Sequence, residues 1–566
     1  MNSLVLVILT FSGFIVAYHT YGRFLSKKIF NLKRSHRTPS CEFQDGVDYV
    51  PTRKEVLFGH HFTSIAGLGP ILGPAIGVIW GWVPAILWIF LGSIFKGAVH
   101  DFGSLVASIR NRGKSIGDIA RDIISPRVRT IFLFVIFFEL WIVMAIFALI
   151  IALLFDMYPE SIFPVWMEIP IAMWLGFMVY RRGKSTNLMA PLAVIFMYIS
   201  IIIGAYTPLR LPPLFGISPI IIWMVILFIY CYIASTLPVW KLLQPRDYIN
   251  GHELLIMMVL LFAGIIVAHP VMVAPAINIS PLGSPPMWPF LFVVIACGAI
   301  SGFHSLVSSG TSSKQLSEEP HAQFVGYGGM LTEGVLSILV LVSVAAGIGL
   351  GLASDGGVLT GTSAWMHHYS SWQAAKGLAS KINAFMGGAI NLLGEIGIPR
   401  HIASSIIGVF LVSFAATTLD SATRIQRYAI SELTSNTQLH FLSYRHPATA
   451  FAVVTAMLLA FAQKGGKGAL ILWPLFGTVN QLLAGLALLV VTVYLYKRKK
   501  SIVYTVSPMI FMIVMTGWAM ISNIQSFFKD GRYHLFIIGL MVLVLEIWMI
   551  IESLIMMKEE RWSLID

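Results

Sequence analysis

Among the ionisable side chains inside or at the ends of long apolar stretches of this 566-residue sequence, eight are candidates for a function: Asp101, Glu139, Glu333, Asp420, His60, His61, His100 and His304. A charged group at the centre of a bilayer costs about 2.5–3.5 kcal/mol on insertion scales, so an ionisable residue there indicates a function. A carboxyl group shielded from water can bind a proton on one side of a membrane and release it on the other. The candidates for proton coupling are His61, Asp101, Glu333 and Asp420.

Helical spacing suggests partners for some of these groups. Lys96 and His100 are one turn apart and share a face, whereas Asp101 lies about 140° round the helix from Lys96. We therefore expect Asp101 to pair with a residue on another helix. Asp420 precedes Arg424 by four residues, so a structural ion pair between these two is the alternative to a coupling role. For the adjacent histidines 60 and 61, interfacial hydrogen bonding is the alternative.

Glycine and proline cluster in the middle of the apolar segment 59–77, GHHFTSIAGLGPILGPAIG. A membrane helix satisfies its own backbone, so such a cluster is tolerated only where the freed groups meet protein or a water-lined cavity. We expect the helix to unwind near 67–70 and to expose amide groups at the start of the next half-helix, where the dipole favours a carboxylate. A kink that permits close packing is the alternative. The candidate substrate-binding residues in this segment are Thr63, Ser64, Gly67, Leu68, Gly69 and Pro70.

Two further apolar segments are interrupted. Pro238 and Pro245 break the segment 234–248 five spans later, and paired interruptions are typical of an inverted-repeat transporter with a site at the membrane midplane. The segment 297–311 places serines and a histidine at the end of another span. Hydroxyl oxygens there could coordinate a cation such as Na⁺, or simply bond to neighbouring backbone. We add Pro238, Trp240, Phe303 and His304 to the substrate site, and Ser305, Ser308 and Ser309 as candidate cation ligands.

The elements that must position these residues are membrane-spanning helices. Hydrophobic residues make up 57% of the sequence and charged residues 11%, against about 25% charged in a soluble domain. This composition excludes a soluble fold. Apolar runs able to cross a bilayer, roughly 17–25 residues each, recur along the chain, and we predict about fifteen: 4–21, 61–79, 82–109, 131–155, 164–179, 189–205, 219–239, 254–268, 289–307, 323–350, 402–419, 448–461, 469–495, 502–521 and 535–551.

The net charge of +12 reflects membrane topology rather than nucleic-acid binding. Of the 38 lysines and arginines, 29 fall in one set of alternate loops, 8 fall in the other, and Lys96 lies inside a span. Because cytoplasmic loops are enriched in basic residues, the N-terminus is predicted to be periplasmic and the C-terminus cytoplasmic. The outer segment 353–400 is too polar to span and is predicted to form amphipathic surface helices. Three scattered cysteines indicate neither disulfides nor a metal site, and we expect no cofactor.

Seven stretches between about Asp45 and Leu495 form a specific set: PTRKEVLFGHHFTSIAGLGPILGPAIG, VHDFGSLVASIRNRGKSIG, LPVWKLLQPRDYI, ACGAISGFHSLVSSGTSSKQL, FVGYGGMLTEG, LDSATR and WPLFGTVNQLLAGLAL. In this order they resemble the signatures of the carbon starvation protein A family. The resemblance implies uptake of peptides or, in some members, of pyruvate with protons. It also implies the five-plus-five inverted-repeat core of the amino acid-polyamine-cation superfamily, in which a break matching 66–70 receives the substrate carboxylate. The chain departs from the family pattern at Lys96 and His100, which leaves the substrate open.

These observations predict an all-α, polytopic inner-membrane protein of bacteria. An extra N-terminal helix (1–22) and a cytoplasmic loop (23–58) precede a LeuT-like transport core (59–432), and about four extra helices follow (433–566). The predicted function is import of a peptide or pyruvate, driven by protons, with alternating access and without enzymatic activity. The partners are the solute, H⁺ and lipid, and no nucleic acid is expected.

Three alternatives stay open: a Na⁺-coupled transporter, a channel, and a membrane-embedded metal hydrolase that uses His60, His61 and His304. The pair His252 and Glu253 begins an HExxH zinc motif, but Ile256 occupies its final position, so the ligand pair of that motif is missing.

Overall fold

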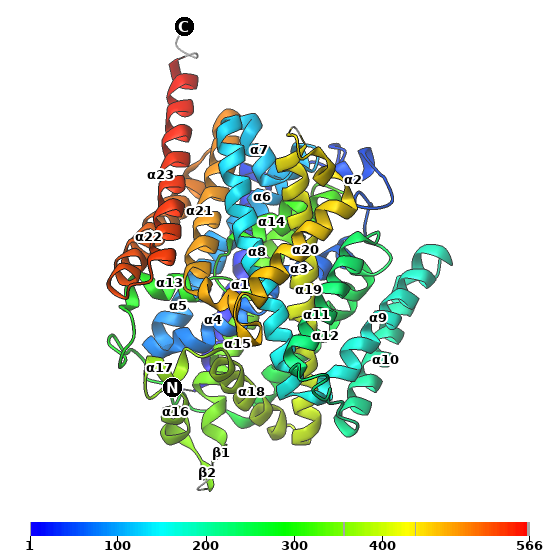
Figure 1. Cartoon of the computed structure of the whole chain (residues 1–566), viewed down its shortest axis with the longest axis vertical. Coiled ribbons are helices and arrows are strands. Elements are labelled where there is room, and N and C mark those ends of the chain that lie inside the picture. The colour runs from blue at the N-terminus through cyan, green and yellow to red at the C-terminus, as the bar shows by residue number, and fades with distance from the viewer. Residues whose placement is uncertain (1, 355–356, 436, 563–566) are drawn as a thin grey trace.

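The protein is a bundle of long helices in the computed structural model, which describes residues 2–354, 357–435 and 437–562 (Figure 1). Apart from the helices, two short strands, β1 (Leu352–Ser354) and β2 (Gly357–Leu359), pair antiparallel, with Ala353 opposite Val358. The predicted all-α class of a polytopic membrane protein is therefore confirmed.

Twelve helical segments of the described chain are long and apolar enough to span a membrane. They are Ser3–Ile29 (including α1, Ser3–Ala17), Trp82–Arg110 (α5, Trp82–Gly92, and α6, Ala98–Arg110), α8 (Pro126–Met157), Pro159–Arg181 (including α9, Ile162–Gly176), α10 (Thr186–Tyr206), α11 (Pro219–Thr236), α12 (Leu243–Ala268), Gln323–Leu350 (including α15, Gly328–Ala345), α19 (Arg400–Thr434), α21 (Trp473–Lys497), α22 (Val503–Lys529) and Tyr533–Lys558 (within α23, Tyr533–Trp562). A bent pair, α3 (Lys54–Ala66) and α4 (Gly69–Gly77), is a thirteenth span if its halves are counted together.

The remaining two predicted spans are shorter in the structure. The segment 448–461 lies in α20 (Arg445–Phe461), which has 17 residues. The segment 289–307 is divided into α13 (Met287–Val294) and α14 (Gly302–Gly310), which have only eight and nine residues. Every predicted apolar segment is thus largely helical, but hydropathy does not distinguish one continuous span from two half-helices.

Short helices cover the two ends of the bundle. α2 (Pro39–Glu42) and α7 (Ile116–Ile123) lie at the top of Figure 1. The β-hairpin, α16 (Gly361–Tyr369), α17 (Trp372–Ala375) and α18 (Leu378–Glu395) lie at the bottom. α18 has one exposed and one buried face and is not among the membrane-length spans, and its buried face packs against α4, α12, α15 and α19. Phe385 and Leu392 on this face are completely buried.

Two long helices, α8 and α19, pack against each other in the middle of the molecule. α9 and α10 also pack against each other, and they form a hairpin at the right edge of Figure 1. α10 exposes apolar side chains such as Ile195 and Ile199. Such surfaces fit lipid, because a bilayer solvates apolar side chains but not unpaired backbone groups.

Candidate substrate site and buried ionic clusters

The predicted break in the helix of residues 59–77 is confirmed. α3 ends at Ala66, α4 begins at Gly69, and the two helices are bent by 42°. Across the described chain, the amides of Gly67, Leu68 and Gly69 have no hydrogen-bond acceptor. These donors lie at the N-terminus of α4, where the helix dipole is positive.

Gly67 and Gly69 lie where neighbouring segments approach the break most closely. A Cβ atom on Gly67 would overlap the Thr418 hydroxyl on α19, and one on Gly69 would overlap the Cys297 sulfur. Only glycine permits so close an approach, because any other residue would place a side-chain atom in the occupied space. The break is therefore clamped between α19 and the residues around Cys297.

A second break lies beside the first, between α13 and α14. Residues 295–301 are not helical, and a side chain on Gly73 of α4 would meet the carbonyl oxygen of Val294. Asn480 and Gln481 of α21 hold this break in place. The Asn480 Oδ1 atom accepts a 3.0 Å bond from the Phe303 amide, and the Gln481 Nε2 atom donates to the Ile300 carbonyl at 3.0 Å. The start of α14 is thus capped by protein, unlike the start of α4.

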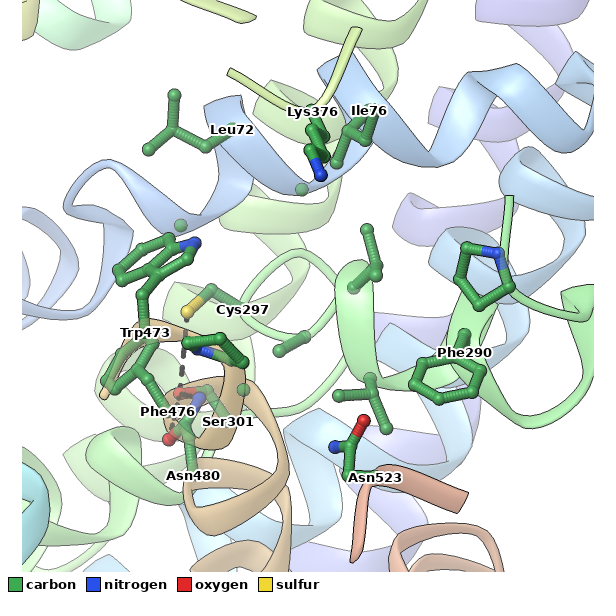
Figure 2. Close-up of a pocket in the computed structure, with 18 of the residues that line it drawn as sticks. Leu72, Ile76, Phe290, Cys297, Ser301, Lys376, Trp473, Phe476, Asn480 and Asn523 are labelled. Carbon is green, nitrogen blue, oxygen red and sulfur yellow. Dashed lines mark hydrogen bonds between the residues drawn. The ribbon is translucent and has the colours of Figure 1, made fainter. Parts of the chain in front are cut away.

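A cavity of about 740 Å³ extends from the α17–α18 end of the molecule to both breaks (Figure 2). Its inner wall contains the backbone of 67–69 together with Cys297, Ser301, Thr418 and Asn480. Its side walls are mainly apolar and include Leu72, Ile76, Phe290, Trp473 and Phe476. Near its mouth lie Lys376, Lys381, Lys529 and Asp530. A cavity with apolar walls and a few convergent polar groups is typical of a small-molecule site.

Four of the predicted substrate residues line this cavity: Gly67, Leu68, Gly69 and Phe303. Thr63 and Ser64 are buried nearby in α3, and Ser64 shares a 3.0 Å hydrogen bond with Ser421. Pro70 is in the first turn of α4, where its carbonyl accepts a 3.4 Å bond from Ser337. None of these last three is among the lining residues.

Pro238 and Trp240 lie in the turn between α11 and α12, away from the cavity lining. The indole nitrogen of Trp240 donates to the Gly46 carbonyl at 3.1 Å. Sequence reasoning did not select the serine, threonine, asparagine and lysines of the lining. Asn480 had a signal, since it belongs to the WPLFGTVNQ stretch, whereas the lysines resembled ordinary loop residues.

Four buried ionisable residues form one chain, which we call the central cluster: His100 and Asp101 of α6, His304 of α14 and Glu333 of α15. His100 Nδ1 lies 2.7 Å from Asp101 Oδ1, and His304 Nδ1 lies 3.0 Å from Asp101 Oδ2. The other ring nitrogen of His304 lies 3.4 Å from Glu333 Oε2. The expectation that Asp101 pairs with another helix is confirmed. The central cluster joins three predicted site residues, Asp101, His304 and Glu333.

His61 of α3 lies beside the central cluster. Its Nδ1 atom is 2.8 Å from the Ser312 hydroxyl, and a side chain on Gly329 of α15 would contact its ring. The preceding residue, His60, faces elsewhere, with its Nδ1 atom 2.5 Å from Asp247 Oδ2. Both histidines are completely buried. They are therefore inside the bundle and not at an interface with water.

A second buried group, the Arg246 cluster, is centred on α12. The Arg246 guanidinium contacts Asp420 of α19 and lies 2.8 Å from Asp247 and 3.7 Å from Glu168 of α9. Tyr230 accepts a 2.7 Å bond from Arg246 and donates to Asp420 at 2.9 Å. Asp420 is thus in a different cluster from Asp101 and Glu333.

Asp420 and Arg424 each pair with another residue, so the alternative of a structural ion pair between them is wrong. Arg424 instead donates to Asp48 at 2.6 Å and to the Leu237 carbonyl at 2.6 Å. Helical spacing puts two side chains on one face, but a neighbouring helix can supply a better-placed partner to each. Here Arg246 neutralises Asp420, while Arg424 binds the loop before α3.

Replacing Arg246 with methionine is expected to destabilise the protein by about 3–5 kcal/mol, because three buried carboxylates would lose their shared cation. The check is thermal unfolding of purified protein in detergent. Lys241→Met, at an exposed residue of the preceding turn, is the matched control. An unchanged melting temperature for the Arg246 variant would mean that the cluster is not held by its charge.

The three candidate cation ligands follow one helix, α14. Ser305 donates to the Gly302 carbonyl at 2.7 Å, and Ser309 donates to the Ser305 carbonyl at 2.7 Å. Ser308 has no hydrogen-bond partner within the described chain. Two of the three hydroxyls therefore bond to neighbouring backbone, which is the alternative that the sequence leaves open.

Ion pairs tie the top end of the bundle together. Asp48 contacts Arg424 at 2.6 Å and Arg427 at 3.5 Å. Burial raises the pKa of Asp48, but the two arginine charges lower it more, so the pKa lies below its ordinary value. Glu319 similarly contacts Arg110 at 2.5 Å and accepts a 2.8 Å bond from the Lys33 amide. These contacts join the loop before α3 to α6, α19 and the segment after α14.

A helical membrane bundle whose cavity ends at two interrupted helices has the architecture of a membrane transport protein. Comparison with known proteins gives the family. The chain belongs to the family described as "Carbon starvation protein CstA", whose model matches residues 2–519.

Curated relatives cover most of the chain. "Pyruvate/proton symporter BtsT" of Escherichia coli (strain K12) is 33% identical over 589 residues, which is 92% of this chain and 81% of that protein. "Peptide transporter CstA" of Helicobacter pylori (strain ATCC 700392 / 26695) is 34% identical over 92% of this chain and 82% of its own length. The protein of that name from Bacillus subtilis (strain 168) is 29% identical over 100% and 97%. These names support a transporter.

Among solved structures, the Eremococcus coleocola manganese transporter in complex with an aromatic bis-isothiourea substituted compound is similar, with 13% identity and a TM-score of 0.47. The similarity covers 91% of this chain and 99% of that one.

Proposed function

We propose that this protein is a secondary active transporter that imports a peptide or a small carboxylate such as pyruvate by proton-coupled alternating access. One observation carries the proposal: the cavity ends at the three unpaired amides of Gly67, Leu68 and Gly69. The printed names of the relatives support both substrate classes.

The unpaired amides favour an anionic group over a neutral one. Amide donors and the positive end of the α4 dipole act together on a carboxylate at this position. The start of α14 offers no equivalent, because Asn480 already occupies the Phe303 amide. Phe290 and Trp473 on the side walls provide apolar surface for the rest of the solute. The carboxylate therefore docks at the α3–α4 break.

Two inverted repeats fit the packing of the helices. The first contains α3/α4, α5/α6, α8, α11 and α12, and the second contains α13/α14, α15, α19, α20 and α21. Equivalent pairs are in contact: α4 with α15 and α14 with α6, α3 with α12 and α13 with α21, and α7 with α8 and α18 with α19. In this arrangement the second break is 295–301 rather than Pro238. The α9–α10 hairpin is an insertion, which preserves orientation because it crosses the membrane twice.

The top of Figure 1 is assigned to the cytoplasm, because the basic loops lie there and cytoplasmic loops carry most lysines and arginines. The N-terminus is then periplasmic and the C-terminus cytoplasmic, as in the inner membrane of a bacterium. The cavity opens towards the periplasm, while the ion pairs of Asp48 and Glu319 close the cytoplasmic end. This arrangement is an outward-facing state.

The central cluster is the proposed proton-coupling site. It connects α6, α14 and α15, with His61 of the broken helix beside it, so a movement of the half-helices changes its geometry. His304 lies between two carboxyl groups and can share one proton with either. Asp420 is a weaker candidate, because Arg246 neutralises it.

Counterflow in proteoliposomes tests the proposal. Vesicles loaded with unlabelled pyruvate or dialanine should take up the labelled solute by saturable exchange without forming a product. Product formation would favour an enzyme, and non-saturable flux would favour a channel. An imposed pH gradient should drive accumulation in the absence of Na⁺, and an absolute requirement for Na⁺ would overturn proton coupling.

A further inference from the structure

One lysine of the cavity lining is buried and has no counter-ion among the residues that the structure describes. Lys381 of α18 is 8% exposed and lines the cavity. Within the described part of the chain, no carboxylate lies within ion-pair distance of its amine. The centre of the Trp473 ring lies 5.9 Å from the Nζ atom of Lys381.

An unpaired buried lysine is costly for a purely structural role. Removing a charged amine from water has a large free-energy cost unless an anion or several hydrogen bonds compensate it. Burial lowers the pKa of Lys381 to about 8, which leaves most molecules protonated at neutral pH. The fold therefore keeps a cation at a position where apolar packing alone would be more stable.

The surroundings of Lys381 select for an anion. Lys376 also lines the cavity, and Figure 2 shows its amine directed into the space. Lys529 and Asp530 contribute one charge of each sign to the same lining. The lysines outnumber the single acidic residue of this lining, so an entering carboxylate meets a favourable potential.

We propose that Lys381 binds the carboxylate of the solute in an outer site, before the solute reaches the amides of the α3–α4 break. This inference rests on the proposed function and adds a second position along the path. Trp473 borders both the lysine and the cavity, so its ring supplies an apolar surface for the methyl or side-chain part of the solute. The ligand class is a small carboxylate anion whose remaining atoms are largely apolar.

Transport by the full chain in proteoliposomes tests the outer site. Lys381→Met should raise the half-saturation concentration for pyruvate exchange about tenfold or more, as expected for losing a hydrogen bond to a charged group. Lys381→Arg should stay close to the parent protein, because it retains the charge. Lys464→Met is the control at an exposed lysine that does not line the cavity, and it should change the value by less than about twofold.

A second measurement does not depend on a variant. Pyruvate should slow acylation of Lys381 by an amine-reactive reagent in the unmodified protein, as followed by mass spectrometry, and should leave Lys464, which does not line the cavity, unaffected. Methyl pyruvate, which lacks the charge, should not protect.

The outcomes separate the two proposals. Normal exchange by Lys381→Met together with unprotected Lys381 would overturn the outer site and leave the proposed function standing. If the parent protein exchanges neither pyruvate nor dialanine, the proposed function fails, and the outer site fails with it.

Discussion

A Gly67→Leu variant is expected to reach the membrane in normal amounts and to lose all uptake of pyruvate and dialanine. Four extra carbon atoms would be placed against Thr418 of α19, where even a Cβ atom overlaps. The variant must then either separate α3 from α19 or move the backbone of 67–69, and both changes displace the amides from the end of the cavity. Initial uptake rates, normalised to the amount of protein in the vesicle, provide the measurement.

The control for this variant is Gly517→Leu. Gly517 is also in a membrane-spanning helix, α22, but a side chain there would enter open space. We expect its uptake to match the parent protein. Transport that survives in Gly67→Leu would rule out the break as the carboxylate site, even if the cavity still binds the solute elsewhere.

Glu333→Gln is expected to abolish accumulation driven by a pH gradient while it preserves counterflow. Glutamine has nearly the same size and keeps a hydrogen-bonding group near His304, but it cannot exchange a proton. The substitution leaves the cavity lining unchanged, since Glu333 is not among the lining residues. The solute should therefore still cross in both directions, without being concentrated. Paired assays of ΔpH-driven uptake and counterflow on the same vesicles distinguish the two properties.

Glu546→Gln supplies the matched control. Glu546 is another buried carboxyl group without a hydrogen-bond partner in the described chain, but it lies in α23, outside the two proposed repeats. Its replacement should leave accumulation intact. Concentrative import by Glu333→Gln would show that Glu333 has a structural role and that the central cluster does not couple through it.

The sequence predicted the helices and the first break well, because both depend on local composition. The length of an apolar run locates a span. The pattern Gly-Leu-Gly-Pro in the middle of a span predicts unwinding whichever helices surround it. The second break shows the limit of this reasoning. Pro238 and the residues 297–301 both interrupt apolar runs, but only the latter lie beside α4. Whether an interruption is a turn at the end of the bundle or a break inside it depends on the neighbouring helices.

The ionic contacts show the same limit. The spacing of Asp420 and Arg424 is compatible with a pair, but each finds its partner far away in the sequence, at Arg246 and Asp48. Lys381 was not selected either, because a lysine in a polar segment between two spans is usually solvated. Its burial arises from the docking of α18 into the bundle, which no local pattern indicates.

The adjacent histidines of α3 have a mechanical consequence. His60 contacts Asp247 of the Arg246 cluster, whereas His61 contacts Ser312 beside the central cluster. Successive side chains of a helix point about 100° apart, so one rigid rod reaches two separate polar networks. A tilt of α3 that weakens the contact of one histidine therefore also changes the contact of the other. A single movement of this half-helix is thereby transmitted to both polar networks at once.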